Sequence, residues 1–177
     1  PHFLSRHDAD LLDPEACAKV IAGAQVDAVI NAAAWTAVDR AETEEAVATI
    51  VNGHAPGAMA QACASANLPF IHISTDYVFD GTGDAPFTPD YPPQPVSAYG
   101  RSKLAGEDAI RESGARHLIL RTSWVVSAHG ANFVKTMLRL GATRDALNVV
   151  SDQIGGPTPA ASIAAALYSI AAQMRDG

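Results

Sequence analysis

Short apolar runs alternate along this chain with longer segments whose apolar residues recur at helical spacing. Runs typical of buried strands cover residues 26–31, 68–74, 117–121 and 147–150, and helical segments cover residues 14–22, 42–66, 98–112, 132–140 and 160–174. Strands that alternate with helices indicate a parallel sheet with right-handed crossovers. We therefore expect an α/β fold, a doubly wound parallel sheet with helices on both faces.

Local signals predict where one helix begins and where one long loop lies. Asp13 followed by Pro14 is typical of a helix N-cap with proline at the first helical position. Residues 80–95 contain five prolines, two glycines and three aspartates, which predicts an irregular loop. Long irregular loops inside domains are commonly lids or binding loops.

Composition limits the class of protein. A chain of 177 residues with 48% hydrophobic and 18% charged residues forms one globular domain, or most of one. The net charge is −7 and the lysines and arginines are scattered, so we expect no nucleic-acid partner. No apolar run approaches the roughly 20 residues of a membrane span, and no signal-peptide pattern opens the sequence. The expected location is cytoplasmic, with no membrane partner.

Cysteine and histidine spacing indicates no metal site. Cys17 and Cys63 lie in alanine-rich helical segments, where a cysteine commonly serves as a small buried hydrophobe. The six histidines show no His-x-x-x-His pattern, and there is no Cys-x-x-Cys. We expect neither a disulfide nor a structural zinc ion.

A hydroxyl, a phenol and an amine are spaced for carbonyl chemistry. Tyr99 and Lys103 stand four residues apart on a predicted helix, so they share one face. An ammonium near a phenol lowers the cost of the phenolate, and such a tyrosine exchanges a proton with a carbonyl oxygen. Thr75 ends a predicted strand upstream, at the edge where open α/β sheets bind ligands. It would hydrogen-bond the same oxygen.

Five motifs occur in one order over nearly the whole chain. They are NAAAWTAVD at residues 31–39, STDYVF at residues 74–79, the Tyr99/Lys103 pair, RTSWV at residues 121–125 and DQ-x-G-x-P-T at residues 152–158. In these motifs the chain resembles the extended short-chain dehydrogenases/reductases, and within them the dTDP-4-dehydrorhamnose reductase family. The resemblance implies a Rossmann-like NAD(P)-binding domain over residues 1–177. The family's N-terminal glycine loop and most of its C-terminal substrate-binding part are missing, so we expect a fold that is incomplete at both ends.

The resemblance implies roles for the catalytic and cofactor-binding residues. Tyr99 would donate a proton to the C4 carbonyl of the sugar, Lys103 would hold the nicotinamide ribose, and Thr75 would orient the reacting oxygen. The cofactor, NADPH or NADH, would contact these residues: Asp10, Leu11, Ala33, Ala34, Thr36, Asn52, Tyr99 and Lys103. In this family Asn52 corresponds to an asparagine that supports the catalytic region through backbone hydrogen bonds.

The resemblance also implies a substrate, a dTDP-linked 4-keto-6-deoxy sugar. Thr75, Asp76, Tyr77, Trp124 and Gln153 would contact it, with Asn132 a further polar candidate. The ring of Trp124 could stack on the sugar or the pyrimidine. The expected reaction is reduction of the C4 keto group of dTDP-4-dehydro-6-deoxy-L-mannose to dTDP-L-rhamnose. Members of the family form homodimers, some with a divalent metal at the interface, which gives Mg²⁺ as a further expectation.

Other activities of related proteins stay open as alternatives. A 4,6-dehydratase needs a second carboxylate after the aspartate that follows the catalytic threonine, but here Tyr77 follows Asp76. A 4-epimerase typically has a serine-rich strand end. A third alternative is a non-catalytic regulatory subunit with the same fold, which the joint presence of Thr75, Tyr99 and Lys103 disfavours.

Overall fold

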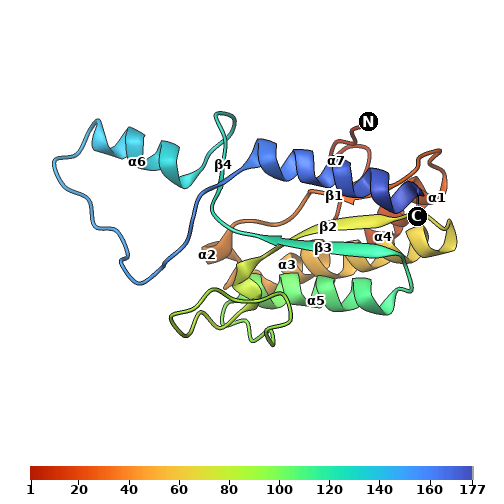
Figure 1. Ribbon diagram of the computed structural model, residues 1–177, viewed down its shortest axis with the longest axis horizontal. Helices are drawn as coiled ribbons and strands as arrows, with labels where there is room; N and C mark the ends of the chain where they lie inside the picture. The colour runs from red at the N-terminus through yellow and green to blue at the C-terminus, as the bar shows by residue number, and fades with distance from the viewer. Residues whose placement is uncertain (177) are drawn as a thin grey trace.

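A sheet of three parallel strands forms the centre of the computed structural model, which describes residues 1–176. The strands are β1 (Val29–Asn31), β2 (Phe70–Thr75) and β3 (His117–Thr122), and they lie in the order β1-β2-β3 (Figure 1). Within the sheet, Ile71 pairs with Ile30 on one side and Leu118 on the other. Because the strands are parallel, their carboxyl ends share one edge of the sheet.

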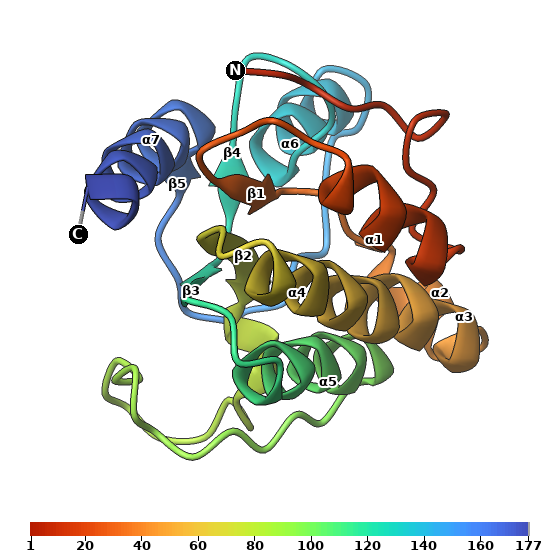
Figure 2. The same cartoon turned by 90° about the vertical axis from the view of Figure 1, so that its right-hand side faces the viewer.

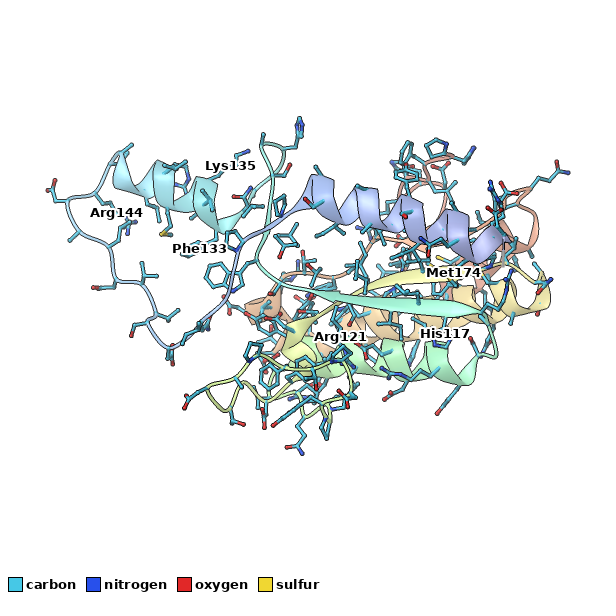
Figure 3. The ribbon with its side chains drawn as sticks, viewed as in Figure 1. His117, Arg121, Phe133, Lys135, Arg144 and Met174 are labelled. Carbon is cyan, nitrogen blue, oxygen red and sulfur yellow. The ribbon has the colours of Figure 1, made fainter. Side chains whose placement is uncertain are left out.

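Helices cover both faces of this sheet. The helices α1 (Pro14–Ala22), α4 (Ala55–Ser65) and α5 (Ala98–Glu112) lie on one face, and α7 (Ala160–Asp176) lies on the other (Figure 2). Arg116, just before β3, donates to the carbonyl oxygen of Met174 at 2.9 Å, which ties the end of α7 to the sheet. Figure 3 labels Met174 on α7 and His117 at the start of β3. The expected α/β architecture with helices on both faces is confirmed.

A buried apolar cluster joins the three helices of the first face to the sheet. Its members include Cys17, Ile21, Met59, Cys63, Phe70 and Ile110. Both cysteines are free and buried, and burial raises the pKa of the Cys63 thiol to about 12. They pack as small apolar side chains.

One predicted strand is wrong. Residues 147–150 form no strand, and the side chains of Val149 and Val150 are 52% and 63% exposed. A run of β-branched residues becomes a strand only where a neighbouring strand supplies hydrogen bonds and packing, and this run has none. The short parallel pair in this part of the chain is instead β4 (Val125–Val126) with β5 (Thr158–Pro159), separated by α6 (Phe133–Gly141).

The helix predicted over residues 42–66 is divided. Over these residues the structure has a turn, α3 (Glu45–Thr49), the π-helix η1 (Ile50–His54) and then α4, and the short helix α2 (Val38–Ala41) precedes them. Pro56 explains the π-helix, because proline has no N–H to bond the carbonyl of Asn52 and its ring clashes with that carbonyl in a regular helix. The backbone widens, and Ala55 N–H bonds Ile50 O instead.

The helix α5 has the predicted bounds and lies very close to its neighbours. Ser97 caps it by accepting from Gly100 N–H at 3.1 Å. A Cβ atom at Gly106 would collide with the carbonyl oxygen of Asn52 in η1, and a Cβ atom at Gly100 would collide with that of Tyr77. These two glycines therefore set how closely α5 approaches the segments beside it.

Across residues 1–176, no helix has both the length and the apolar composition needed to cross a bilayer.

Replacing Gly106 with alanine tests the close contact of α5 with η1. Gly106→Ala should lower the free energy of unfolding by about 3 kcal/mol, because backbone rather than a flexible side chain must move. Gly141→Ala on α6 is the matched control, since no atom lies within 4 Å of its added Cβ, and it should change stability by no more than about 1 kcal/mol. Urea unfolding measures both. Equal effects would contradict the contact.

Candidate active site

Thr75 stands at the carboxyl end of β2, where the strand leads directly into the 3₁₀ turn η2 (Asp76–Val78). Its side chain is 6% exposed. The hydroxyl accepts from Tyr77 N–H at 3.2 Å and donates to Asp76 Oδ1 at 3.2 Å. The turn therefore holds the Thr75 hydroxyl in a fixed orientation at the end of the sheet.

Tyr99 lies in the first turn of α5, next to Thr75 and Tyr77. Its side chain is 9% exposed, and its ring meets that of Tyr77 edge-to-face, with centroids 5.4 Å apart. Burial raises the pKa of Tyr99, contact with Thr75 lowers it, and the charges of Asp76 and Tyr77 raise it further. The balance is a raised pKa, so the phenol keeps its proton at neutral pH and is available as an acid.

Lys103 reaches the interior of the sheet from the next turn of α5. Its side chain is 2% exposed; Nζ donates to Ile73 O at 2.8 Å and lies 2.9 Å from Nε2 of His72. Burial lowers the pKa of Lys103 to about 8, against an opposing effect of Glu107. The sequence-based expectation that Lys103 lowers the pKa of Tyr99 is wrong in this structure. Desolvation of the phenol dominates, and Lys103 is not among the groups that shift it.

Asn52 connects the loop after β1 to α5. It is completely buried in η1. Its Oδ1 accepts from Trp35 N–H at 2.8 Å, and its Nδ2 donates to Trp35 O at 3.1 Å and to Ser102 Oγ at 2.9 Å. Ser102 in turn donates to Tyr99 O at 2.7 Å. Asn52 thus supports the first turn of α5 through backbone contacts, and its amide is fully engaged by protein groups.

Four of the residues expected at the cofactor line one cavity beside β1. The cavity has a volume of about 840 Å³, and its lining includes Asp10, Leu11, Ala33 and Ala34. Thr36 is exposed and lies outside this lining, as do Thr75, Tyr99 and Lys103. The cavity therefore lies beside β1, whereas Tyr99 lies beside the end of β2. These two strands are neighbours in the sheet.

Asp10 is held in place at the wall of this cavity. One carboxylate oxygen accepts from Leu12 N–H at 3.0 Å and the other from Arg6 Nε at 3.1 Å. The hydrogen bond from Leu12 is the main cause of a lowered pKa for Asp10. The loop that carries Asp10 and Leu11 is shaped by these contacts.

The expected substrate residues form two groups. Asp76 and Tyr77 lie beside Thr75 in η2, and Tyr77 is 39% exposed. Trp124 lies after β3 with a backbone φ of 49°, which is unusual for a bulky residue. Its ring meets that of Phe133 edge-to-face at 5.0 Å. Gln153 is exposed, on the segment that brings Gly155 against the Trp124 indole.

Asn132 has a structural use. Its Oδ1 caps α6 by accepting from Lys135 N–H at 3.1 Å, and its Nδ2 donates to Ser127 O at 2.7 Å. Both ends of the amide are therefore engaged in forming the start of α6.

Arg121 and Glu107 hold the long loop of residues 80–95, and the sequence analysis predicted no role for either side chain. Glu107 is completely buried and accepts two hydrogen bonds from Arg121, at 2.9 and 2.6 Å. Arg121 also donates to Pro89 O at 3.1 Å and lies over the ring of Phe79. Despite burial, the pKa of Glu107 is lowered, through hydrogen bonds led by that from Arg121.

The contact of His72 with Asn31 was also not predicted. His72 is completely buried in β2, between Asn31 and Lys103. A histidine inside an otherwise apolar run was the available signal, but its partners lie far away in the sequence.

The sequence analysis gave Mg²⁺ as a further expectation. In the part of the chain that the structure describes, no group of three or more His, Cys, Asp or Glu side chains is placed to hold a metal ion.

The neutral state of His72 gives stability a pH dependence. Burial, followed by the charge of Lys103, lowers the pKa of His72 from 6.5 to about 3. Between these values the unfolded chain binds a proton that the folded chain does not, so stability falls as pH falls. The loss should be of the order of 4 kcal/mol. Urea unfolding at several pH values should show this loss of stability at low pH in the parent and not in His72→Phe.

The exposed His129 provides the control. His129→Asn should keep the pH dependence of the parent, since that side chain is hydrated in both states. If the free energy of unfolding of His72→Phe changed with pH in parallel with that of the parent, a neutral buried imidazole would be contradicted.

Comparison with known proteins finds relatives named dTDP-4-dehydrorhamnose reductase. It is 48% identical to a dTDP-4-dehydrorhamnose reductase of Burkholderia thailandensis over 174 residues, 98% of this chain and 58% of that protein. The crystal structure of a dTDP-4-dehydrorhamnose reductase from Clostridium acetobutylicum matches with a TM-score of 0.91 and 37% identity. That of the Bacillus anthracis protein in complex with NADP matches with a TM-score of 0.91 and 34% identity.

Each of these structures is matched over 97% of this chain and 61% of its own length. The chain therefore spans about three fifths of the relatives it matches. Their fold agrees with the Rossmann-like sheet described above. A family model described as the RmlD substrate binding domain matches residues 2–177, and the chain belongs to this family.

Proposed function

We propose that the protein is an NAD(P)H-dependent reductase that converts the C4 keto group of dTDP-4-dehydro-6-deoxy-L-mannose to the alcohol of dTDP-L-rhamnose. The observation that carries this proposal is the placing of Thr75 and Tyr99 together at the carboxyl end of β2, with Lys103 one turn further along α5. The names of the similar proteins support the same activity.

The cavity beside β1 fits a nicotinamide dinucleotide. Ala33 and Ala34 present only methyl groups at the end of β1, so an extended ligand could pack against the main chain there. The NADP complex of the Bacillus anthracis protein supports such a ligand. When bound, the reduced nicotinamide supplies a hydride to the sugar carbonyl. Residues 1–177 would then form part of an NAD(P)-binding domain.

In the proposed reaction, the residues at the end of β2 handle the developing charge on the C4 oxygen. The protonated phenol of Tyr99 donates its proton to this oxygen. The Thr75 hydroxyl turns its hydrogen from Asp76 Oδ1 to donate a hydrogen bond to the same oxygen. A protonated Lys103 lies one turn further along α5. It has one N–H beyond those directed at His72 and Ile73, and we assign this N–H to the nicotinamide ribose.

The substrate would lie across η2 and the segment after β3. Asp76 and Tyr77 would contact the sugar next to Thr75, and Trp124 and Gln153 would contact the nucleotide from the other side. The edge-to-face contact with Phe133 leaves the faces of the Trp124 ring for stacking. A homodimer and a cytoplasmic location belong to the same proposal.

A regulatory subunit without activity is distinguished by a direct assay. Oxidation of NADPH or NADH by the intact protein, in the presence of the dTDP-linked 4-keto sugar, supports a reductase. Tight binding of the nucleotide sugar without oxidation would favour the binding role.

Removing the phenolic hydroxyl tests the proposed acid. Tyr99→Phe should lower kcat by about 10²- to 10⁴-fold, because the ring still packs on Tyr77 while the proton donor is lost. The readout is the rate of oxidation of the reduced nicotinamide. Tyr168→Phe on α7, whose side chain is 51% exposed, is the matched control and should retain the parent rate. Parent-like activity in Tyr99→Phe would remove this residue from the mechanism.

A further inference from the structure

Asn31, His72 and Lys103 form a buried chain of contacts from β1 through β2 to α5. Asn31 Nδ2 lies 3.1 Å from His72 Nδ1, and His72 Nε2 lies 2.9 Å from Lys103 Nζ. The three side chains are 6%, 0% and 2% exposed, respectively. Each ring nitrogen of His72 therefore faces one protein partner.

The Asn31 amide decides which ring nitrogen carries the hydrogen. Asn31 Oδ1 accepts from Ala33 N–H at 3.0 Å, so the amide oxygen is directed at the loop and the NH₂ group at His72. Since an NH₂ group only donates, Nδ1 must be the acceptor. The lowered pKa keeps the ring neutral, and its one hydrogen lies on Nε2.

This tautomer suits only one protonation state of Lys103. The Nε2–H group faces Nζ, and a neutral amine accepts that hydrogen bond through its lone pair. An ammonium has no lone pair, so the two groups would be opposed donors. When Lys103 takes up a proton from solvent, the ring must carry its single hydrogen on Nδ1, so that Nε2 accepts from the ammonium. Asn31 must then turn its oxygen toward Nδ1, which breaks the hydrogen bond from Ala33.

We propose that His72 is a positioning residue that couples the protonation of Lys103 to the loop after β1, through the tautomer of its ring and the orientation of the Asn31 amide. The inference rests on the proposed function only in assigning Lys103 to the active site. Ala33 lines the cavity beside β1. A ligand that packs there and the charge on Lys103 therefore influence each other reciprocally.

The remaining charged groups around Lys103 do not replace this contact. Glu107, one turn further along α5, acts on both His72 and Lys103, but its carboxylate is already paired with Arg121 of β3 and with Arg111. Asp76 of η2 acts on Tyr99. The buried polar side chain of η1 is Asn52, which is bonded to Ser102.

The tautomer can be followed directly by NMR. The intact protein is labelled with ¹⁵N-histidine and titrated through pH 8, near the pKa of Lys103, without substrate or cofactor. The His72→Phe variant identifies the signals of His72. We expect the Nε2–H tautomer at the basic end and the Nδ1–H tautomer at the acidic end. A single tautomer throughout would overturn the proposal.

A pair of variants separates the coupling from a simple charge effect. Asn31→Asp keeps an acceptor for Ala33 N–H and adds one for Nδ1–H, so it should fix the Nδ1–H tautomer and favour charged Lys103. The midpoint of the Lys103 titration, followed with ¹⁵N-lysine, should rise by about one pH unit or more. In a His72→Phe background, the same Asn31→Asp change should shift the midpoint by less than half as much. Equal shifts in both backgrounds would overturn the proposal.

These readouts need no turnover. A tautomer change in a protein that lacks reductase activity would support the coupling while removing the proposed function. Reductase activity in a protein whose His72 keeps one tautomer would support the proposed function and overturn the coupling.

Discussion

The helix α5 lies so close to two neighbouring segments that only glycine fits at the points of contact. Gly100 faces the carbonyl of Tyr77 in η2, and Gly106 faces that of Asn52 in η1. Because both contacts involve backbone atoms, they fix the position and rotation of the helix more firmly than flexible side chains would. Tyr99 and Lys103 project from this helix, and their places beside β2 follow from the contacts on either side of them.

Burial, rather than attraction between charges, dominates the electrostatics of the candidate site. It raises the pKa of Tyr99 and lowers those of Lys103 and His72. For reduction of a carbonyl, this is a useful combination, since the phenol must hold a proton before the hydride arrives. A lysine that titrates near pH 8 is available to exchange a proton close to neutral pH. The structure thus keeps the Tyr99 phenol protonated, as the role of an acid requires.

Local sequence signals predicted the helices that have clear capping residues. They failed where the structure depends on contacts between residues far apart in the sequence. The bounds of α1 and α5 agree with prediction, because Asp13 and Ser97 cap them. The strand at residues 147–150 was wrong, since apolar residues alone do not supply a neighbouring strand. The place of Tyr99 beside Thr75 could be predicted from the order of the motifs. The contact of His72 with Asn31 joins residues 41 positions apart, which no local pattern shows.

A crystal structure of the intact protein with a nicotinamide cofactor and a thymidine nucleotide tests the central claim most directly, namely that Thr75, Tyr99 and Lys103 form one carbonyl-reducing site next to the cavity of β1. The account predicts the dinucleotide in that cavity, with its nicotinamide ring beside Tyr99 and its ribose hydroxyls at hydrogen-bonding distance from Lys103, about 3 Å. A nicotinamide ring bound away from Tyr99, with Lys103 directed only at His72 and Ile73, would contradict it.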